Sequence, residues 1–96
     1  MNSDQKELFR LAILRVLDAN RTRFGFGVSE IAMHLFSAGF NRRNFNNDEA
    51  AFRAAILDQL EYLTEKGLIE EPRKLISGEN RTWKIAPAGI AFIDEH

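Results

Sequence analysis

The residues that decide the fold are 60–69, which read LEYLTEKGLI, and 83–89, which read WKIAPAG. Apolar side chains recur three and four residues apart before and within the first segment: Phe52, Ile56, Leu60 and Leu63. That spacing places them on one side of a helix. Gly67 is the natural end of this helix, because glycine adopts the left-handed conformation of a C-terminal cap without steric cost. We therefore expect a helix over about 48–66, followed by an extended segment that enters the core.

A β-hairpin is expected to follow this helix. Pro72 would begin it, with strands near 73–77 and 81–86 joined by a turn at 77–80. Apolar and polar residues alternate in the second strand: Thr82, Trp83, Lys84 and Ile85. Such alternation is typical of a strand with one buried face. Trp83 is expected to anchor the core beneath the hairpin, and an exposed stacking surface is the alternative.

Three further helices are expected, over about 4–19, over about 30–38, and from Pro87 onward. Proline suits the first turn of the last helix, which holds Ile90, Phe92 and Ile93. Short side chains that accept a hydrogen bond from a free N–H predict the caps: Asn2 or Ser3, Ser29, and Asn46 with Glu49 in a capping-box position. Gly39 would end the second helix, whose inward side chains would be Ile31, Leu35 and Phe36.

The first helix is apolar around most of its circumference. Its expected core face comprises Leu8, Phe9, Ala12, Ile13 and Val16. Leu11 and Leu14 are expected to point the other way. A small domain does not bury both sides of a helix at its edge. Either this helix is central, or Leu11 and Leu14 form a dimer or partner face.

Length and composition indicate one globular domain over residues 1–96. The chain is 45% hydrophobic and 28% charged, which are ordinary globular values. It has no cysteine, so disulfides and thiolate metal sites are excluded. No apolar run approaches the roughly 20 residues that cross a membrane, and the polar start does not resemble a signal peptide. We expect an α+β, mostly helical protein of the cytoplasm.

The order helix, short strand, helix, helix, strand, strand, helix resembles a winged helix-turn-helix domain over nearly the whole chain. The resemblance is carried by Leu-x-x-Leu-x-x-x-Gly-Leu-Ile at 60–69 and by Ala-Pro-Ala-Gly at 86–89. Length and pattern are also similar, more weakly, to small prophage-encoded winged-helix proteins. The resemblance implies binding of double-stranded DNA, by a small bacterial or phage transcription regulator that is often dimeric. It also implies that the start of the third helix enters the major groove while the hairpin touches the backbone.

Charge along the chain is uneven, although the net charge is only −1. Residues 21–43 hold four arginines against one glutamate, and residues 72–87 hold four cations against one glutamate. Arginine binds guanine or phosphate through two hydrogen bonds, and asparagine pairs with adenine. The candidate DNA contacts are therefore Arg42, Arg43, Asn44, Asn46, Asn47, Arg53, Arg73, Lys74, Arg81 and Lys84. Local salt bridges or simple solvation are the alternative for the Arg42–Arg43 pair.

The expected third helix is the most acidic part of the chain. Residues 44–71 hold seven carboxylates against two cations. Its outward side would carry Ala50, Ala51, Ala54, Asp58, Glu61 and Glu65. Carboxylates repel phosphates, so this face departs from the DNA-binding pattern. The alternative function is a protein-protein interaction adaptor of the same fold with no direct DNA binding.

Catalysis is not expected. Nothing in the chain assembles a nucleophile, a base and an orienting group, and no histidine has a second ligand at metal spacing. The acidic pairs Asp48-Glu49 and Glu70-Glu71 suit a helix start and a strand entry. We expect neither a metal nor a cofactor.

Overall fold

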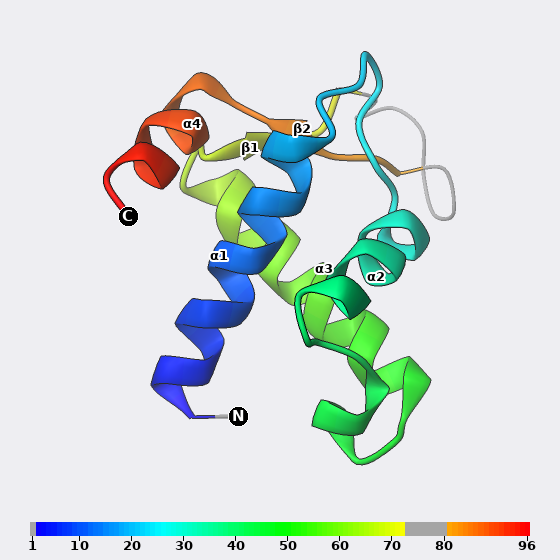
Figure 1. The fold of residues 1–96 in the computed structure, drawn as a ribbon. Helices are drawn as coiled ribbons and strands as arrows, with labels where there is room; N and C mark the ends of the chain where they lie inside the picture. The colour runs from blue at the N-terminus through cyan, green and yellow to red at the C-terminus, as the bar shows by residue number, and fades with distance from the viewer. Residues whose placement is uncertain (1, 73–80) are drawn as a thin grey trace.

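The computed structural model describes residues 2–72 and 81–96. Its described elements are α1 (Ser3–Ala19), α2 (Val28–Ser37), the 3-10 helix η1 (Arg42–Phe45), α3 (Glu49–Glu65), β1 (Ile69–Glu70), β2 (Lys84–Ile85) and α4 (Pro87–Asp94) (Figure 1). The protein is thus α+β and mostly helical, as expected. The first expected strand, the turn at 77–80, and Arg73 and Lys74 lie outside the described residues.

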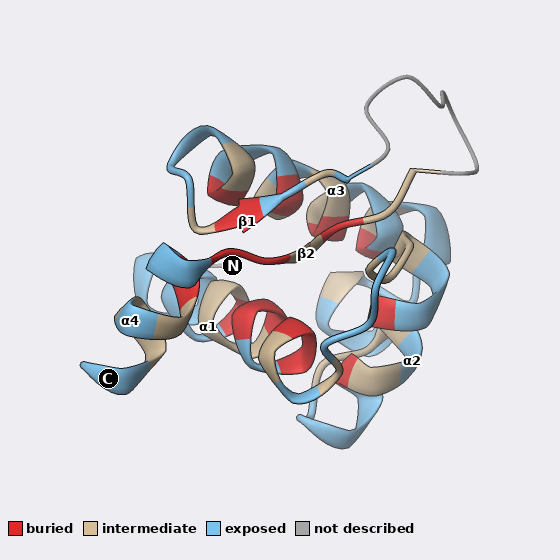
Figure 2. Ribbon diagram, turned by 90° about the horizontal axis from the view of Figure 1, so that it is seen from above, coloured by how far each residue is buried: buried red, intermediate tan, exposed pale blue. Residues whose placement is uncertain are grey.

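The two strands lie at one end of the long helices α1 and α3 (Figure 1). Seen from above, they lie between α3 on one side and α1 with α4 on the other (Figure 2). β1 contacts α3 and β2 contacts α1, while α2 contacts both long helices. The buried positions of the helices face the interior of the molecule (Figure 2). The least exposed side chains there are Trp83, Phe9, Ile13, Leu14, Leu17, Ile31, Leu35, Ile56, Leu60, Leu63 and Ile69.

α1 buries a different face from the one expected. Leu14 is 0% exposed and belongs to the core, whereas Leu8 is 60% exposed. Both expectations were wrong because α1 contacts β2 and α4 on one side and α2 on another, so its buried arc follows its neighbours. Leu11 remains at the surface as expected, partly exposed.

The α2 and α3 caps also differ from expectation. The N-cap of α2 is Gly27, not Ser29, and Glu30 Oε1 accepts a hydrogen bond from Gly27 N at 3.0 Å. α3 is capped by Asp48, not by Asn46: Asp48 Oδ1 accepts from Ala51 N at 3.1 Å. A carboxylate at that position also suits the positive end of the helix dipole. Asn2 caps α1, as expected, by accepting from Gln5 N.

The strands pair antiparallel, with Ile69 opposite Ile85 and Glu70 opposite Lys84. Of the expected second strand 81–86, only Lys84–Ile85 is paired as a strand. Trp83 joins residue 26 instead, through Phe26 N to Trp83 O at 2.8 Å and Trp83 N to Phe26 O at 2.9 Å. Trp83 is 1% exposed, which confirms its expected place in the core.

Left-handed glycines fit three bends of the described chain. Gly67 has φ 76°, which confirms the expected left-handed end of α3. Gly25 has φ 79°, and a Cβ there would collide with the carbonyl oxygen of Trp83. Gly25 therefore lets the chain before α2 approach the backbone of the hairpin. Gly39 is left-handed too and follows the end of α2, as expected.

A cluster of phenylalanines joins α1 to the start of α3. The ring of Phe9 lies 5.2 Å from Phe40, 5.7 Å from Phe45 and 6.5 Å from Phe52, between centroids. The tilted arrangement is one that aromatic rings prefer. Phe45 belongs to η1, so this cluster fixes η1 against the core. No helix in the described part of the chain is both long and apolar enough to cross a membrane.

Candidate nucleic-acid interface

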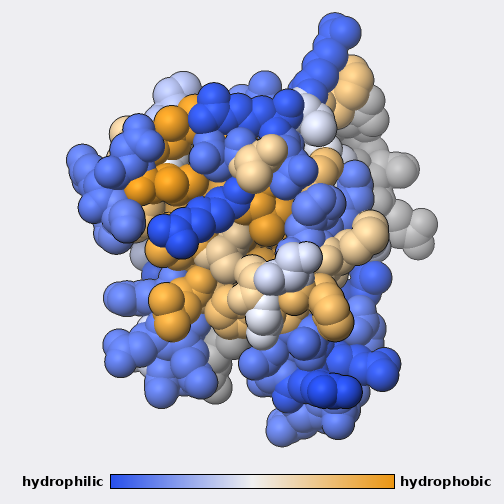
Figure 3. Space-filling view, viewed as in Figure 1, coloured by the Kyte–Doolittle hydropathy of each residue, from blue (hydrophilic) through white to orange (hydrophobic). Residues whose placement is uncertain are grey.

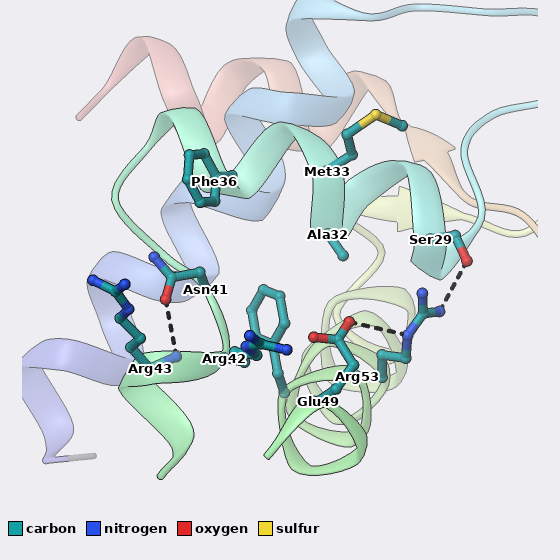
Figure 4. A pocket seen from close by; sticks show the side chains of 10 residues that line it. Ser29, Ala32, Met33, Phe36, Asn41, Arg42, Arg43, Glu49 and Arg53 are labelled. Atoms are coloured by element: carbon teal, nitrogen blue, oxygen red, sulfur yellow. Dashed lines mark hydrogen bonds and ion pairs between the residues drawn. The ribbon is translucent and has the colours of Figure 1, made fainter. Parts of the chain in front are cut away.

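A groove between α2, η1 and the first turn of α3 brings three of the candidate residues together. We call it the arginine groove. It is lined by Ser29, Ala32, Met33, Phe36, Asn41, Arg42, Arg43, Glu49, Phe52 and Arg53. Side chains of α2 lie along one side, and the three arginines lie opposite (Figure 4). The candidate residues Arg42, Arg43 and Arg53 thus share a common surface.

η1 fixes the backbone that carries Arg42 and Arg43. Asn41 Oδ1 accepts from Arg43 N at 2.9 Å, and Asn41 N donates to Asn44 Oδ1 at 2.9 Å. Asn47 N closes the turn by donating to Arg42 O at 2.9 Å. With Phe45 packed against the core, the backbone that carries both arginines is ordered before any partner arrives. The sequence predicted a plain loop here, because η1 has too few residues to show a period.

The positive charge of the groove is partly uncompensated. Arg42 and Arg43 are exposed and form no ion pair with any residue that the structure describes. Arg53 lies 3.4 Å from Glu49 (Nε to Oε1) and donates to Ser29 Oγ at 2.8 Å. An exposed i,i+4 pair of this kind contributes only about 0.3–0.5 kcal/mol. A phosphate could therefore replace Glu49 as the partner of Arg53 at small cost.

The neighbouring asparagines have backbone reasons for their identity. Asn46 and Asn47 have φ 58° and 59°, so two successive residues are left-handed. Asparagine tolerates this conformation better than other residues with a Cβ. The side-chain oxygen of Asn44 is already used by Asn41 N. Of the three candidate amides, only those of Asn46 and Asn47 remain exposed without a hydrogen bond to the described residues.

A second groove adjoins the first and reaches the base of the hairpin. Ser29 and Arg53 line both of them. The second groove is lined by Gly27, Val28, Ser29, Glu30, Arg53, Leu57, Arg81 and Trp83. Four of the candidate arginines thus follow a continuous surface from η1 to the hairpin.

The hairpin cations in the described part are compensated. Arg81 forms a forked pair with Glu71, at 2.9 Å and 3.2 Å, and lies 3.8 Å from Glu61. The hydrogen bond from Arg81 to Glu71 raises the pKa of Arg81, and the charges of Glu71 and Glu61 add to the rise. Lys84 lies 3.3 Å from Glu70, its partner in the strand register. These cations close the base of the hairpin and offer less free charge than Arg42 and Arg43.

The outward face of α3 is acidic, as expected. Asp58, Glu61 and Glu65 are exposed on it, beside the small exposed residues Ala50 and Ala54. Asp48 and Glu49 add two exposed carboxylates at the start of the helix, where Arg53 also lies. An anion approaching α3 therefore meets a cation of this helix only near its N-terminal end, at Arg53.

Two apolar residues of the arginine groove were not anticipated. Met33 is 67% exposed and Phe36 is 69% exposed, and both face the groove from α2. Phe36 was expected to point inward, which is wrong, because Ile31 and Leu35 occupy the buried side of this short helix. The spacing of Met33 and Phe36, three residues apart on a helix, was the available signal. Among the described residues, no group of acidic and histidine side chains could hold a metal ion.

Comparison of the chain with protein-family models, with curated proteins and with solved structures finds no match in any of the three.

Proposed function

We propose that the protein binds double-stranded DNA in the manner of a small winged-helix transcription regulator. The element order supports this, with the Phe26–Trp83 bridge in the place of the short strand. The observation that carries the proposal is the arginine groove, where Arg42 and Arg43 have no acidic partner among the described residues. Neutralising phosphates supplies most of the affinity of such proteins.

The charges favour a particular docking. The phosphate backbone would lie along the arginine groove, against Arg42, Arg43 and Arg53, with Asn46 and Asn47 toward base edges. The free N–H groups at the start of α3 favour an anion there, although Asp48 and Glu49 weaken this effect. The acidic outer face of α3 would point away from the duplex. In this docking, the N-terminal end of α3 contacts the duplex and the rest of the helix does not.

Replacing both free arginines tests the proposal. We expect Arg42→Ala with Arg43→Ala to weaken binding to a labelled random duplex by about 10- to 100-fold at low salt. The slope of log affinity against log salt should also fall by about 2, since each lost phosphate contact removes about 0.9. Fluorescence anisotropy at several salt concentrations measures both quantities.

The matched control removes two cations at the other end of the molecule. Arg21 follows α1 and pairs with Asp18, and Lys66 caps the far end of α3. Arg21→Ala with Lys66→Ala changes the net charge by the same amount. If both double variants lose the same affinity, net charge alone explains the loss. That result would contradict DNA binding at the arginine groove. Wild-type protein that binds no duplex at low salt would contradict DNA binding itself.

A protein-interaction adaptor is the second candidate, favoured by the exposure of Met33 and Phe36 beside three arginines. An amphipathic acidic helix would place apolar side chains on Met33 and Phe36 and carboxylates on the arginines. The variant Met33→Ser with Phe36→Ser separates the two functions. If DNA is the ligand, duplex affinity should change less than about threefold, because phosphate contacts dominate. A Glu- and Leu-rich helical peptide that binds the wild type and not this variant would support the adaptor instead.

A further inference from the structure

The outer face of α1 carries a stripe of four residues: Asp4, Leu8, Leu11 and Arg15. They are separated by four, three and four positions. At about 100° per residue they fall within about 60° of arc. The buried residues of α1 lie on the opposite side, centred on Ile13 and Leu17. The stripe therefore points directly away from the core.

The stripe presents apolar surface between two unpaired charges. Leu8 is 60% exposed and Leu11 is partly exposed. Asp4 and Arg15 are exposed, and neither forms an ion pair with the residues that the structure describes. Apolar side chains gather in the middle of the face that α1 occupies, with hydrophilic side chains around them (Figure 3).

A shallow groove runs along each side of this stripe. Toward α2, Leu8, Leu11 and Arg15 share a groove with Phe40. Toward α4, Asp4, Leu8 and Leu11 share a groove with Phe92. A ridge with a groove on each side is the shape that helix packing uses, because the ridge of one helix fits the groove of another.

We propose that this face binds a second copy of the chain, with the two α1 helices antiparallel about a two-fold axis. The stripe is complementary to itself in that arrangement alone. With the axis between positions 9 and 10, Leu8 meets Leu11 of the other copy, and Asp4 meets Arg15. Each contact occurs twice, as in any two-fold interface. A parallel pairing would instead place Asp4 on Asp4 and Arg15 on Arg15.

Charge complementarity selects a second copy over an unrelated partner. The apolar pair occupies the centre of the stripe and opposite charges end it, as in interfaces with an apolar core and a polar rim. The central leucines supply contact area, while the end charges fix orientation and reject wrong pairings. Leu8 takes the place expected of Leu14, which is buried within its own chain.

Charge reversal tests the pairing directly. Asp4→Arg alone places two cations against each other in both end contacts, and Arg15→Asp alone places two carboxylates against each other in both. We expect each variant to raise the dimer dissociation constant by about tenfold or more, since like charges in contact oppose association. An equimolar mixture of the two variants forms heterodimers in which one end contact joins the two original charges and the other joins the two reversed charges. Both end contacts of the heterodimer therefore join opposite charges, whereas both end contacts of each single-variant homodimer join like charges.

A doubly reversed chain provides a second test of the same pairing. Asp4→Arg with Arg15→Asp in one chain restores opposite charges in both end contacts, so we expect it to associate as the wild type does. The mixture of the two single variants should also associate as the wild type does, because both end contacts of their heterodimer join opposite charges. Sedimentation velocity without DNA measures the self-association of the single variants, of their mixture and of the doubly reversed chain.

The control is Lys6→Glu, a charge reversal on the same helix outside the stripe, which should leave association unchanged. The Leu8→Ser variant should weaken association like the charge variants while retaining a wild-type far-UV circular dichroism spectrum. A wild type that stays monomeric at about millimolar concentration would overturn the proposal. So would a doubly reversed chain that associates no better than the single variants. Duplex binding by the arginine groove is measured separately, so failure of the dimer does not count against it.

Discussion

Gly25→Ala is expected to lower the free energy of unfolding by about 3 kcal/mol or more. The new Cβ would collide with the carbonyl oxygen of Trp83. Relief requires separation of Phe26 from Trp83, whose two backbone hydrogen bonds contribute about 1 kcal/mol each. The left-handed backbone, φ 79°, adds about 1–2 kcal/mol for any residue with a Cβ. Urea unfolding followed by circular dichroism gives the value.

Gly67→Ala separates the two causes of this loss. Gly67 has nearly the same φ, 76°, but nothing lies within 4 Å of a Cβ built there. We expect a loss of about 1–2 kcal/mol, from conformation alone. The difference between the two variants then measures the close approach of the chain before α2 to the hairpin. Equal losses would mean that residue 25 and Trp83 are not in contact in solution.

Phe9→Ala is expected to cost about 3–5 kcal/mol, the range for a large aromatic side chain removed from a core. Phe9 is 1% exposed and lies against three other rings. For a domain of this size, each kcal/mol lowers the melting temperature by about 4–8 °C. The variant should therefore melt more than about 12 °C below the wild type, as measured by thermal denaturation.

Phe36→Ala is the matched control, because the same side chain is 69% exposed there. Its stability should stay within about 0.5 kcal/mol of the wild type. Phe9 also supports Phe45 and hence η1, so Phe9→Ala should weaken duplex binding even at temperatures where it remains folded. A folded Phe9→Ala protein with wild-type DNA affinity would separate η1 from the proposed interface.

α3 was the most predictable part of the fold. Four apolar residues at helical spacing and a glycine stop indicated its buried face and its end, and the structure confirms both. One period and one glycine act within a single segment, so no distant contact was needed. The start of the helix was less predictable, because Asn46 and Asp48 are both good caps. Only the left-handed turn at Asn46 and Asn47 selects Asp48.

α1 shows where periodicity fails. Apolar residues occupy so much of its circumference that several arcs could be buried. The choice depends on neighbours far away in sequence, including β2 and α4. Arg10 illustrates the same point, because it donates to Gln59 at 2.8 Å and lies over the ring of Tyr62, both on α3. No local rule predicts such a contact.

The sequence predicted the charges of the candidate interface but not its shape. The Arg42–Arg43 pair was visible in the sequence, but its apolar companions Met33 and Phe36 were not. They join the groove because α2 and η1 pack on the same side of α3. The pairing of Arg81 with Glu71 was equally hidden, since it depends on the chain returning to the base of the hairpin. Charge is a property of single residues, whereas compensation of charge is a property of the fold.

Trp83 gives the molecule a built-in optical probe. It is the single tryptophan of the chain, it is 1% exposed, and its indole nitrogen has no hydrogen-bond partner among the described residues. The guanidinium of Arg81 lies 4.9 Å from the centre of its ring. An indole shielded from water emits at shorter wavelength than one in contact with water. Because Trp83 joins the chain before α2 to the hairpin, separation of these segments would shift the wavelength of its fluorescence emission. Intrinsic emission can thus distinguish local opening at this junction from loss of helix elsewhere, with no added label.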